Sequence, residues 1–149
     1  MADMFSVRKR SEIMSRVRSR DNKATELRLI YVFRAHSIRG WRRRGKAFGN
    51  PDFIFPAERL AVFVDGCFWH SCPIHGSIPV SNRLFWKTKL HRNLQRDKLV
   101  RRELQSSGWR VLRIWQHELI HPERVATRVS RLLRQQKIPR VRHQRRKKD

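Results

Sequence analysis

The stretch from Val62 to Gly76 constrains this chain more than any other. It opens with an apolar run typical of a buried strand, which ends at Asp65 and gives way to a turn. Two cysteines, two histidines and the adjacent rings of Phe68 and Trp69 follow within the next ten or so positions. Few functions need a carboxylate, soft metal ligands and large rings so close together, and cutting nucleic acid around a metal ion is one of them.

The charge balance indicates a polyanionic partner. The 149 residues fit one domain, and 36 Lys and Arg against 12 Asp and Glu give a formal net charge of +24. Nucleic acid is the obvious polyanion to offset such self-repulsion. A ribosomal or histone-like scaffold is the first alternative, which five tryptophans disfavour. An anionic membrane surface is the second, but no basic helix has a wide apolar face, so we expect no membrane partner.

The N-terminus lacks the apolar core of a signal peptide, and the longest apolar run, Leu60 to Val64, is too short to span a bilayer. We therefore expect a cytoplasmic protein. Two cysteines in such a chain favour metal ligands over a structural disulfide, although Cys67 and Cys72 could still pair covalently.

Hydrophobic periodicity and turn signals predict an α/β chain, with a mixed central sheet flanked by helices. The expected helices cover residues 11–18, 82–105, 122–133 and a segment from a cap at Asp21 or Asn22 to about His36. The expected strands cover 51–55, 60–65 and 109–115, with a short strand near Trp41. Residues 1–136 form the expected domain, and the charged segment 137–149 is expected to be a disordered tail.

The hairpin brings two acids together. A four-residue turn over 56–59 would place Asp52 opposite Phe63, with Asp65 as its diagonal neighbour on the same face. Two carboxylates at that spacing can share one divalent cation. A one-residue change in the turn would put them on opposite faces instead.

Two further acids lie on apolar helix faces. Glu26 shares a face with Ile30 and Phe33, and Asp97 lies on the stripe that begins at Leu90. A carboxylate facing a core is costly unless it is paired or metal-bound, and for Glu26 alone a salt bridge to an arginine is the better interpretation. Together with Asp52, however, these acids favour a Mg²⁺ site for phosphodiester cleavage.

The histidines and cysteines suggest two kinds of chemistry. His70 follows Asp65 closely and can exchange a proton, with metal binding or a phosphate contact as the alternative. Cys67, Cys72 and His75 supply three ligands of a tetrahedral zinc site, for which a fourth must come from elsewhere. The alternative is a buried cysteine pair with surface histidines. The candidates for the fourth ligand, by residue type, are His70, His91, His117 and His121.

Five motifs in one order make the chain, from about residue 11 to residue 133, similar to the very short patch repair (Vsr) endonucleases. They are Pro51-Asp52-Phe53, Val62 to His70, Phe85-Trp86, Arg96-Asp97, and Gly108 to Leu112 followed by Trp115. The resemblance implies a restriction-endonuclease-like fold of the PD-(D/E)xK type with a structural zinc site. It also implies an enzyme that nicks DNA 5′ to the mispaired thymine of a T:G mismatch, which arises when 5-methylcytosine deaminates.

The resemblance also implies roles for individual residues. Asp52 would be the central Mg²⁺ ligand and His70 the general acid/base, with Glu26 and Asp97 at the remaining acidic positions. Position 65 is often histidine in the family, so Asp65 favours a two-carboxylate arrangement with Asp52. The family places a zinc ligand two residues after the strand tryptophan, which selects His117 and leaves His70 as the runner-up.

Rings and basic side chains complete the predicted DNA interface. Phe68 and Trp69 lie in an irregular loop, where rings can wedge between base pairs, and unstacking costs less at a mismatch. The resemblance implies intercalation for both and for Trp86, although ordinary core packing fits Trp86 equally well. The side chains expected to hold phosphates, rather than simply form a solvated face, are Arg39, Arg42, Arg43, Arg44 and Lys46.

Three readings remain open from the sequence. The first is a Mg²⁺-dependent nickase acting at T:G mismatches as a monomer, near the bacterial nucleoid, with mismatch-repair proteins as candidate partners. The second is a Vsr-like homing or defence endonuclease that cuts both strands. The third is a zinc-stabilised DNA-binding module, in which Asp52→Ala would leave function intact. A duplex-nicking assay, or a neighbouring cytosine methyltransferase gene, separates the first two.

Overall fold

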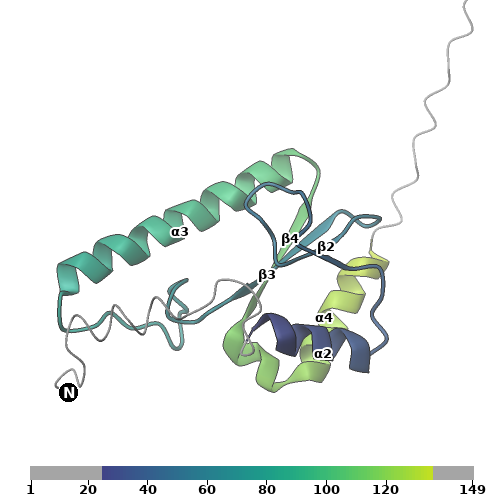
Figure 1. Ribbon diagram of the computed structural model, residues 1–149, viewed down its shortest axis with the longest axis horizontal. Helices are drawn as coiled ribbons and strands as arrows, with labels where there is room; N and C mark the ends of the chain where they lie inside the picture. The colour runs from purple at the N-terminus through teal and green to yellow at the C-terminus, as the bar shows by residue number, and fades with distance from the viewer. Residues whose placement is uncertain (1–24, 136–149) are drawn as a thin grey trace, which may run out of the picture.

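The computed structural model describes residues 25–135 (Figure 1). The expected helix over 11–18, the caps at Asp21 or Asn22 and the basic tail over 137–149 lie outside these residues. Within them, helices cover both faces of one sheet, as the sequence pattern predicts.

The sheet has four strands in the order β1-β2-β3-β4. They are β1 (Arg42–Arg43), β2 (Phe53–Phe55), β3 (Leu60–Asp65) and β4 (Arg110–Trp115). β1, β2 and β3 pair antiparallel, whereas β3 and β4 pair parallel, so the expected mixed sheet is confirmed. The short strand expected near Trp41 is β1.

The helices are α2 (Glu26–Ala35), α3 (Arg83–Ser106) and α4 (Pro122–Arg134). Their order and type match the prediction, but α2 begins at Glu26 with Thr25 as its N-cap, later than expected. A 3-10 helix, η1 (Gln116–Ile120), joins β4 to α4 and was not expected from the sequence. None of the helices in the described part of the chain is long and apolar enough to cross a membrane.

Two apolar clusters hold the layers together. On one face α2 and α4 cover the sheet, where Phe33 packs edge-on against Phe53 and Phe55 (Figure 1). On the other face the last turns of α3 press Val100 and Leu104 onto the sheet. Burying such side chains stabilises each helix far more than its local propensity does.

The hairpin register decides where the acids lie. Phe53 pairs with Val62 and Phe55 with Leu60, which confirms the four-residue turn. Continuing that register places Asp52 opposite Phe63, as the sequence predicts. In the parallel pair, Asp65 faces Trp115 at the end of both strands. The start of β2 and the ends of β3 and β4 therefore meet at one end of the sheet.

Candidate functional site

Asp52 lies at this end of the sheet, just before β2. One of its carboxylate oxygens accepts a hydrogen bond of 2.8 Å from the backbone N–H of Val64. The pKa of Asp52 is raised to about 7, mainly because burial disfavours the charged form; the Val64 N–H opposes the shift, and the nearby carboxylates of Glu26 and Asp65 add to it. Three acids therefore lie close enough for their charges to interact.

Glu26 comes from the first turn of α2 and is 5% exposed. Arg43, on β1, donates to its carboxylate at 2.9 Å from Nη2. The internal salt bridge that was the better interpretation of Glu26 alone is therefore present. It also gives Arg43 an acidic partner inside the protein.

Asp65 ends β3 and is almost wholly buried. The Nη1 of Arg113 donates to both of its carboxylate oxygens, at 2.9 and 2.8 Å. The guanidinium carbon lies 4.5 Å from the centre of the Phe63 ring, which supports it from the strand beside it. Sequence analysis did not single out Arg113; the available signal was an arginine in the middle of a strand that the pattern places in the sheet.

His70 and Asp97 form the closest acid–imidazole pair at the site, with 2.7 Å between Nδ1 and Oδ2. Asp65 lies 3.9 Å from the same nitrogen. Burial lowers the pKa of His70, but its hydrogen bond to Asp97 and the charges of Asp65 and Asp97 outweigh this effect, so that the net shift is upward. With Nδ1 held by Asp97, Nε2 is the ring nitrogen left to exchange a proton.

The second cluster joins the loop over 66–79 to η1. The ligand atoms of Cys67, Cys72, His75 and His117 all lie within 4.8 Å of one another. The Nδ1 of His117 lies 3.3 Å from Sγ of Cys67 and 3.6 Å from Sγ of Cys72, which is itself 4.0 Å from Nδ1 of His75. A tetrahedral zinc ion with ordinary bond lengths places sulfur and nitrogen ligands about 3.5 Å apart. The residues present therefore fit zinc.

The backbone around the cysteines also suits a bound cation. Burial raises the pKa of Cys72, but hydrogen bonds from the backbone N–H groups of His75, Ile74 and Gly76 and from the side chain of Cys67 outweigh burial, so that the net shift is downward. Burial and the neighbouring Cys72 raise the pKa of Cys67 instead. Both cysteines would lose their protons on binding a metal ion.

The aromatic side chains gather between the loop and α3. Phe68 stacks edge-on with Trp69 and Trp86, with ring centres 5.1 and 5.5 Å apart. Trp86 is 5% exposed and forms the floor of this cluster, so the packing interpretation describes it in the free protein, whereas Phe68 and Trp69 are half-buried. Phe85, beside Trp86, is 57% exposed.

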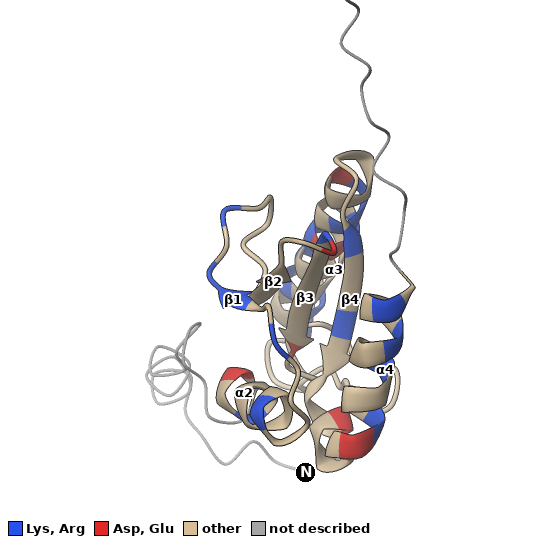
Figure 2. Ribbon diagram, turned by 90° about the vertical axis from the view of Figure 1, so that its right-hand side faces the viewer, with Lys and Arg blue, Asp and Glu red and all other residues tan. Residues whose placement is uncertain are grey.

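Basic residues occupy β1 and the segments on either side of it (Figure 2). Those that are exposed, as a phosphate contact requires, are Arg39, Arg42, Arg44 and Lys46. Arg43 is partly covered and pairs with Glu26. The structure thus separates four outward-facing candidates from one that turns inward.

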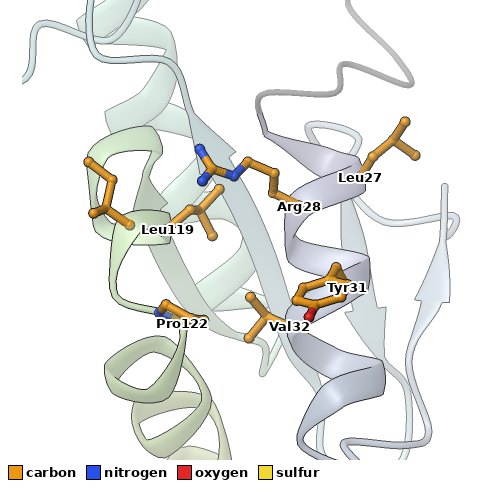
Figure 3. Close-up of a pocket in the computed structure, with 7 residues that line it drawn as sticks. Leu27, Arg28, Tyr31, Val32, Leu119 and Pro122 are labelled. Carbon is orange, nitrogen blue, oxygen red and sulfur yellow. The ribbon is translucent and has the colours of Figure 1, made fainter.

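A separate pocket of about 480 Å³ lies between α2 and the segment formed by η1 and the start of α4 (Figure 3). None of the predicted catalytic, metal-binding or DNA-binding residues lines it. Arg28 is the one charged side chain that lines it, and the remaining lining residues are Leu27, Tyr31, Val32, Leu119, Ile120 and Pro122. Its walls are therefore mainly apolar and offer little for phosphodiester chemistry.

The amino-acid sequence is similar to those of several known proteins. The family model described as DNA mismatch endonuclease Vsr matches residues 2–75. A Type II nicking enzyme, V.NmeAIP of Neisseria meningitidis, is 34% identical over 140 residues, which cover 91% of this chain and 96% of that protein. The DNA mismatch endonuclease Vsr of Escherichia coli is 33% identical over 118 residues, or 78% of this chain and 74% of that protein.

Another relative has a higher sequence identity over a shorter segment. The Type II nicking enzyme V.NaeI of Lentzea aerocolonigenes is 54% identical over 69 residues, which cover 46% of this chain and 42% of that enzyme. The identity, the coverage and the family match agree with the motifs and with the acids that the fold brings together. This chain belongs to the DNA mismatch endonuclease Vsr family and is an endonuclease that acts on DNA.

Proposed function

We propose that this endonuclease uses Mg²⁺ to nick one DNA strand, 5′ to the mispaired thymine of a T:G mismatch left by deamination of 5-methylcytosine. We further infer that its mixed sheet is a version of the restriction-endonuclease-like fold. The observation that supports this most is the meeting of Asp52, Glu26 and Asp65 at one end of the sheet, next to the His70–Asp97 pair.

Asp52 and Asp65 are the carboxylates that would hold the ion. Oxygen ligands of this kind suit Mg²⁺. The pKa of Asp52 is raised mainly by burial and further by the charges of Glu26 and Asp65, and a bound cation would favour its charged form. Arg113 already donates to both oxygens of Asp65, so its positive charge would compete with the ion for this carboxylate. When bound, the ion would lower the pKa of water and neutralise charge on the departing oxygen.

His70 would move the proton of the reaction. Cleavage forms one bond from a water oxygen to phosphorus and breaks one phosphorus–oxygen ester bond. Nε2 of His70 can accept the water proton or, once charged, donate it to the departing oxygen. Asp97 holds the imidazole through Nδ1 and favours its charged form.

The surrounding side chains would bind and distort DNA. Phe68 and Trp69 would wedge between base pairs, supported by Trp86 beneath them. Arg39, Arg42, Arg44 and Lys46 would hold phosphates beside the acids. A mismatch is already weakly stacked, so the same wedge favours it over a matched pair.

The zinc ion would be structural. Cys67, Cys72, His75 and His117 supply four ligands and leave no open position for water, which separates this site from a catalytic one. Through His117, the ion would fasten the ring-bearing loop to the segment that follows β4. Closing a loop this long would add to the stability of a protein whose apolar core is small.

The remaining expectations are proposals of the same standing. The enzyme would act as a monomer on double-stranded DNA in the bacterial cytoplasm, close to the nucleoid, and mismatch-repair proteins would be its partners. The competing reading is a Vsr-like homing or defence endonuclease that cuts both strands without regard to mismatches. The relatives named as nicking enzymes favour the single-strand reading.

The test uses zinc-loaded full-length protein, Mg²⁺ and duplexes labelled on either strand, with T:G, T:A or C:G at one position. We expect a single cut, 5′ to the thymine of the T:G duplex, and little cutting of the other two. Equal cutting of all three duplexes would contradict a function in mismatch repair. Cuts in both strands would favour a homing or defence endonuclease. No cutting by folded protein would contradict a nuclease.

A further inference from the structure

Arg113 contacts two acids of the site, Asp65 and Asp97. Its Nη1 serves both oxygens of Asp65, and its Nη2 lies 3.5 Å from Oδ1 of Asp97. The other oxygen of Asp97 holds His70 at 2.7 Å. One guanidinium therefore connects a candidate metal ligand on β3 with the acid, on α3, that orients the candidate proton carrier.

Arg113 is largely buried, so its burial costs free energy, and its loss would leave buried carboxylates without their partner. Its side chain is 17% exposed, and its Nε is buried without a hydrogen-bond partner. The facing carboxylates are 4% and 18% exposed, so neither is well screened by water. Charged hydrogen bonds between such poorly solvated groups are strong, and removing one partner leaves the other unsatisfied.

Position 113 faces Phe63 in the parallel ladder, on the side of the sheet that α3 covers. Asp65 lies two residues further along β3 on the same side. The guanidinium thus reaches toward the end of β3 and meets Asp97 as α3 passes over the sheet. Neither carboxylate can turn to another partner without breaking a contact with this one side chain.

We propose that Arg113 is a positioning residue of the nicking reaction. Arg113 competes with the metal ion for Asp65, and it aligns Asp97 with His70. This inference rests on the function proposed above. Arg113 need not touch DNA or water for this role. It determines how much of Asp65 is available to the ion, and it fixes the imidazole that moves the proton.

The two parts of this role predict opposite effects of one substitution. In Arg113→Gln, Asp65 loses its bidentate cation and becomes free to bind metal, so the Kd for Mn²⁺ should fall about tenfold. The His70–Asp97 pair loses its support, so single-turnover nicking of a T:G duplex should slow by about tenfold or more. A merely structural role would weaken metal binding and nicking together.

Three further variants show where the gain in affinity comes from. In the double variant Asp65→Asn, Arg113→Gln the tighter Mn²⁺ binding should disappear, because the freed carboxylate is gone. Arg131→Gln, on the exposed side of α4, removes one positive charge elsewhere and should leave the Kd for Mn²⁺ and the nicking rate unchanged. Arg113→Lys keeps the charge but not the planar fork, and should fall between Gln and wild type.

Mn²⁺ binding is measured by calorimetry on zinc-loaded full-length proteins, with thermal unfolding to confirm that each is folded. An Arg113→Gln Kd equal to that of Arg131→Gln would overturn the inference while leaving the proposed function intact. If Arg113→Gln does not fold, an unchanged Kd in Arg113→Lys overturns it. A wild-type protein that binds no Mn²⁺ would overturn the metal-dependent function, and this inference with it.

Discussion

At the scale of single residues, the site is a balance of buried charges. Each of the acids Glu26 and Asp65 has an arginine partner, Arg43 and Arg113 respectively. Asp52 accepts a backbone N–H instead, and neighbouring acids help to raise its pKa. This arrangement suits a site that binds a cation, because the positive charge of the cation would neutralise the carboxylate charge that no arginine pairs with.

Asp52→Asn tests that balance. We expect nicking of a T:G duplex to fall by at least about a thousandfold, because the central oxygen ligand is lost. The melting temperature without Mg²⁺ should stay equal or rise, since a buried negative charge beside two others is removed. Comparing single-turnover rates with melting curves separates the two effects. A variant that melts lower and still nicks would contradict the role of Asp52.

Sequence analysis named most of the residues that meet at this end of the sheet, and it expected an arginine partner for Glu26, but it did not name Arg113. Asp52 and Asp65 could be placed on one face because the hairpin turn has four residues and strands alternate with a period of two. Glu26 and Asp97 stood out as acids on apolar helix faces. Arg113 could not be assigned, because its role depends on the parallel pairing of β3 with β4 and on where α3 passes, which no local pattern encodes.

At the scale of elements, the loop over 66–79 is held from two sides. Asn93, on α3, donates to the carbonyl of Trp69 at 3.1 Å. On the other side, Glu118 accepts the backbone N–H of Trp115 at 2.7 Å and so caps η1, the helix that presents His117 to the cysteines. The loop therefore gains order from its neighbours, and an ion held by the cysteines and histidines would add to it.

Zinc should be part of the folded protein. Purified protein should contain one zinc per chain by elemental analysis, and Cys72→Ser should lose it. The free energy of unfolding should then fall by more than about 4 kcal/mol, a size of effect typical of losing a structural metal.

The matched control is His91→Ala, which removes an exposed histidine that was a candidate by type but lies outside the cluster. It should keep both zinc and stability. Zinc loss from this variant, or full stability of Cys72→Ser without zinc, would contradict the structural assignment.

The rings of the same loop should carry mismatch preference. The double variant Phe68→Ala, Trp69→Ala should lose about ten- to hundredfold of its preference for T:G over T:A duplexes, because each stacked base is worth roughly 1–3 kcal/mol. The preference is measured as a ratio of single-turnover rates. Tyr31→Ala, which removes a 71% exposed ring on α2, is the control and should keep the ratio. An unchanged ratio in the double variant would refute the wedge.

The predicted bounds of the elements were most accurate where the hydrophobic pattern extends over many residues and a turn-forming residue such as glycine follows it. The long helix was expected over 82–105 and is found over Arg83–Ser106, with Gly108 in the left-handed conformation just past its end. The 3-10 helix η1 was missed, because its five residues are too few for a periodic signal and its cap depends on the side chain of Glu118.

At the scale of the whole molecule, charge determines how DNA is approached. The formal net charge is +24, and basic residues run along β1 and α3 (Figure 2). The acids of the site are mostly enclosed by their arginines and by the sheet, so they repel an incoming phosphate less than their number suggests. Affinity should therefore be dominated by counterion release, and selectivity by the site and the rings.

Salt dependence tests this division. With six to ten phosphates contacted, log K for a matched duplex should fall with log salt with a slope of about −5 to −9. Arg42→Gln and Arg44→Gln should each make the slope about one unit shallower without changing the ratio of T:G to T:A nicking. Binding is measured by fluorescence anisotropy at several salt concentrations. Slopes equal to wild type would show that these arginines do not hold phosphates.

The central claim is that acids from different elements converge on one hard cation. Anomalous diffraction from a crystal of the wild-type protein soaked in Mn²⁺ tests it most directly. We expect one peak at this end of the sheet, about 2.0–2.6 Å from a carboxylate oxygen of Asp52. A peak elsewhere, with Asp52 turned toward an arginine, would contradict the account.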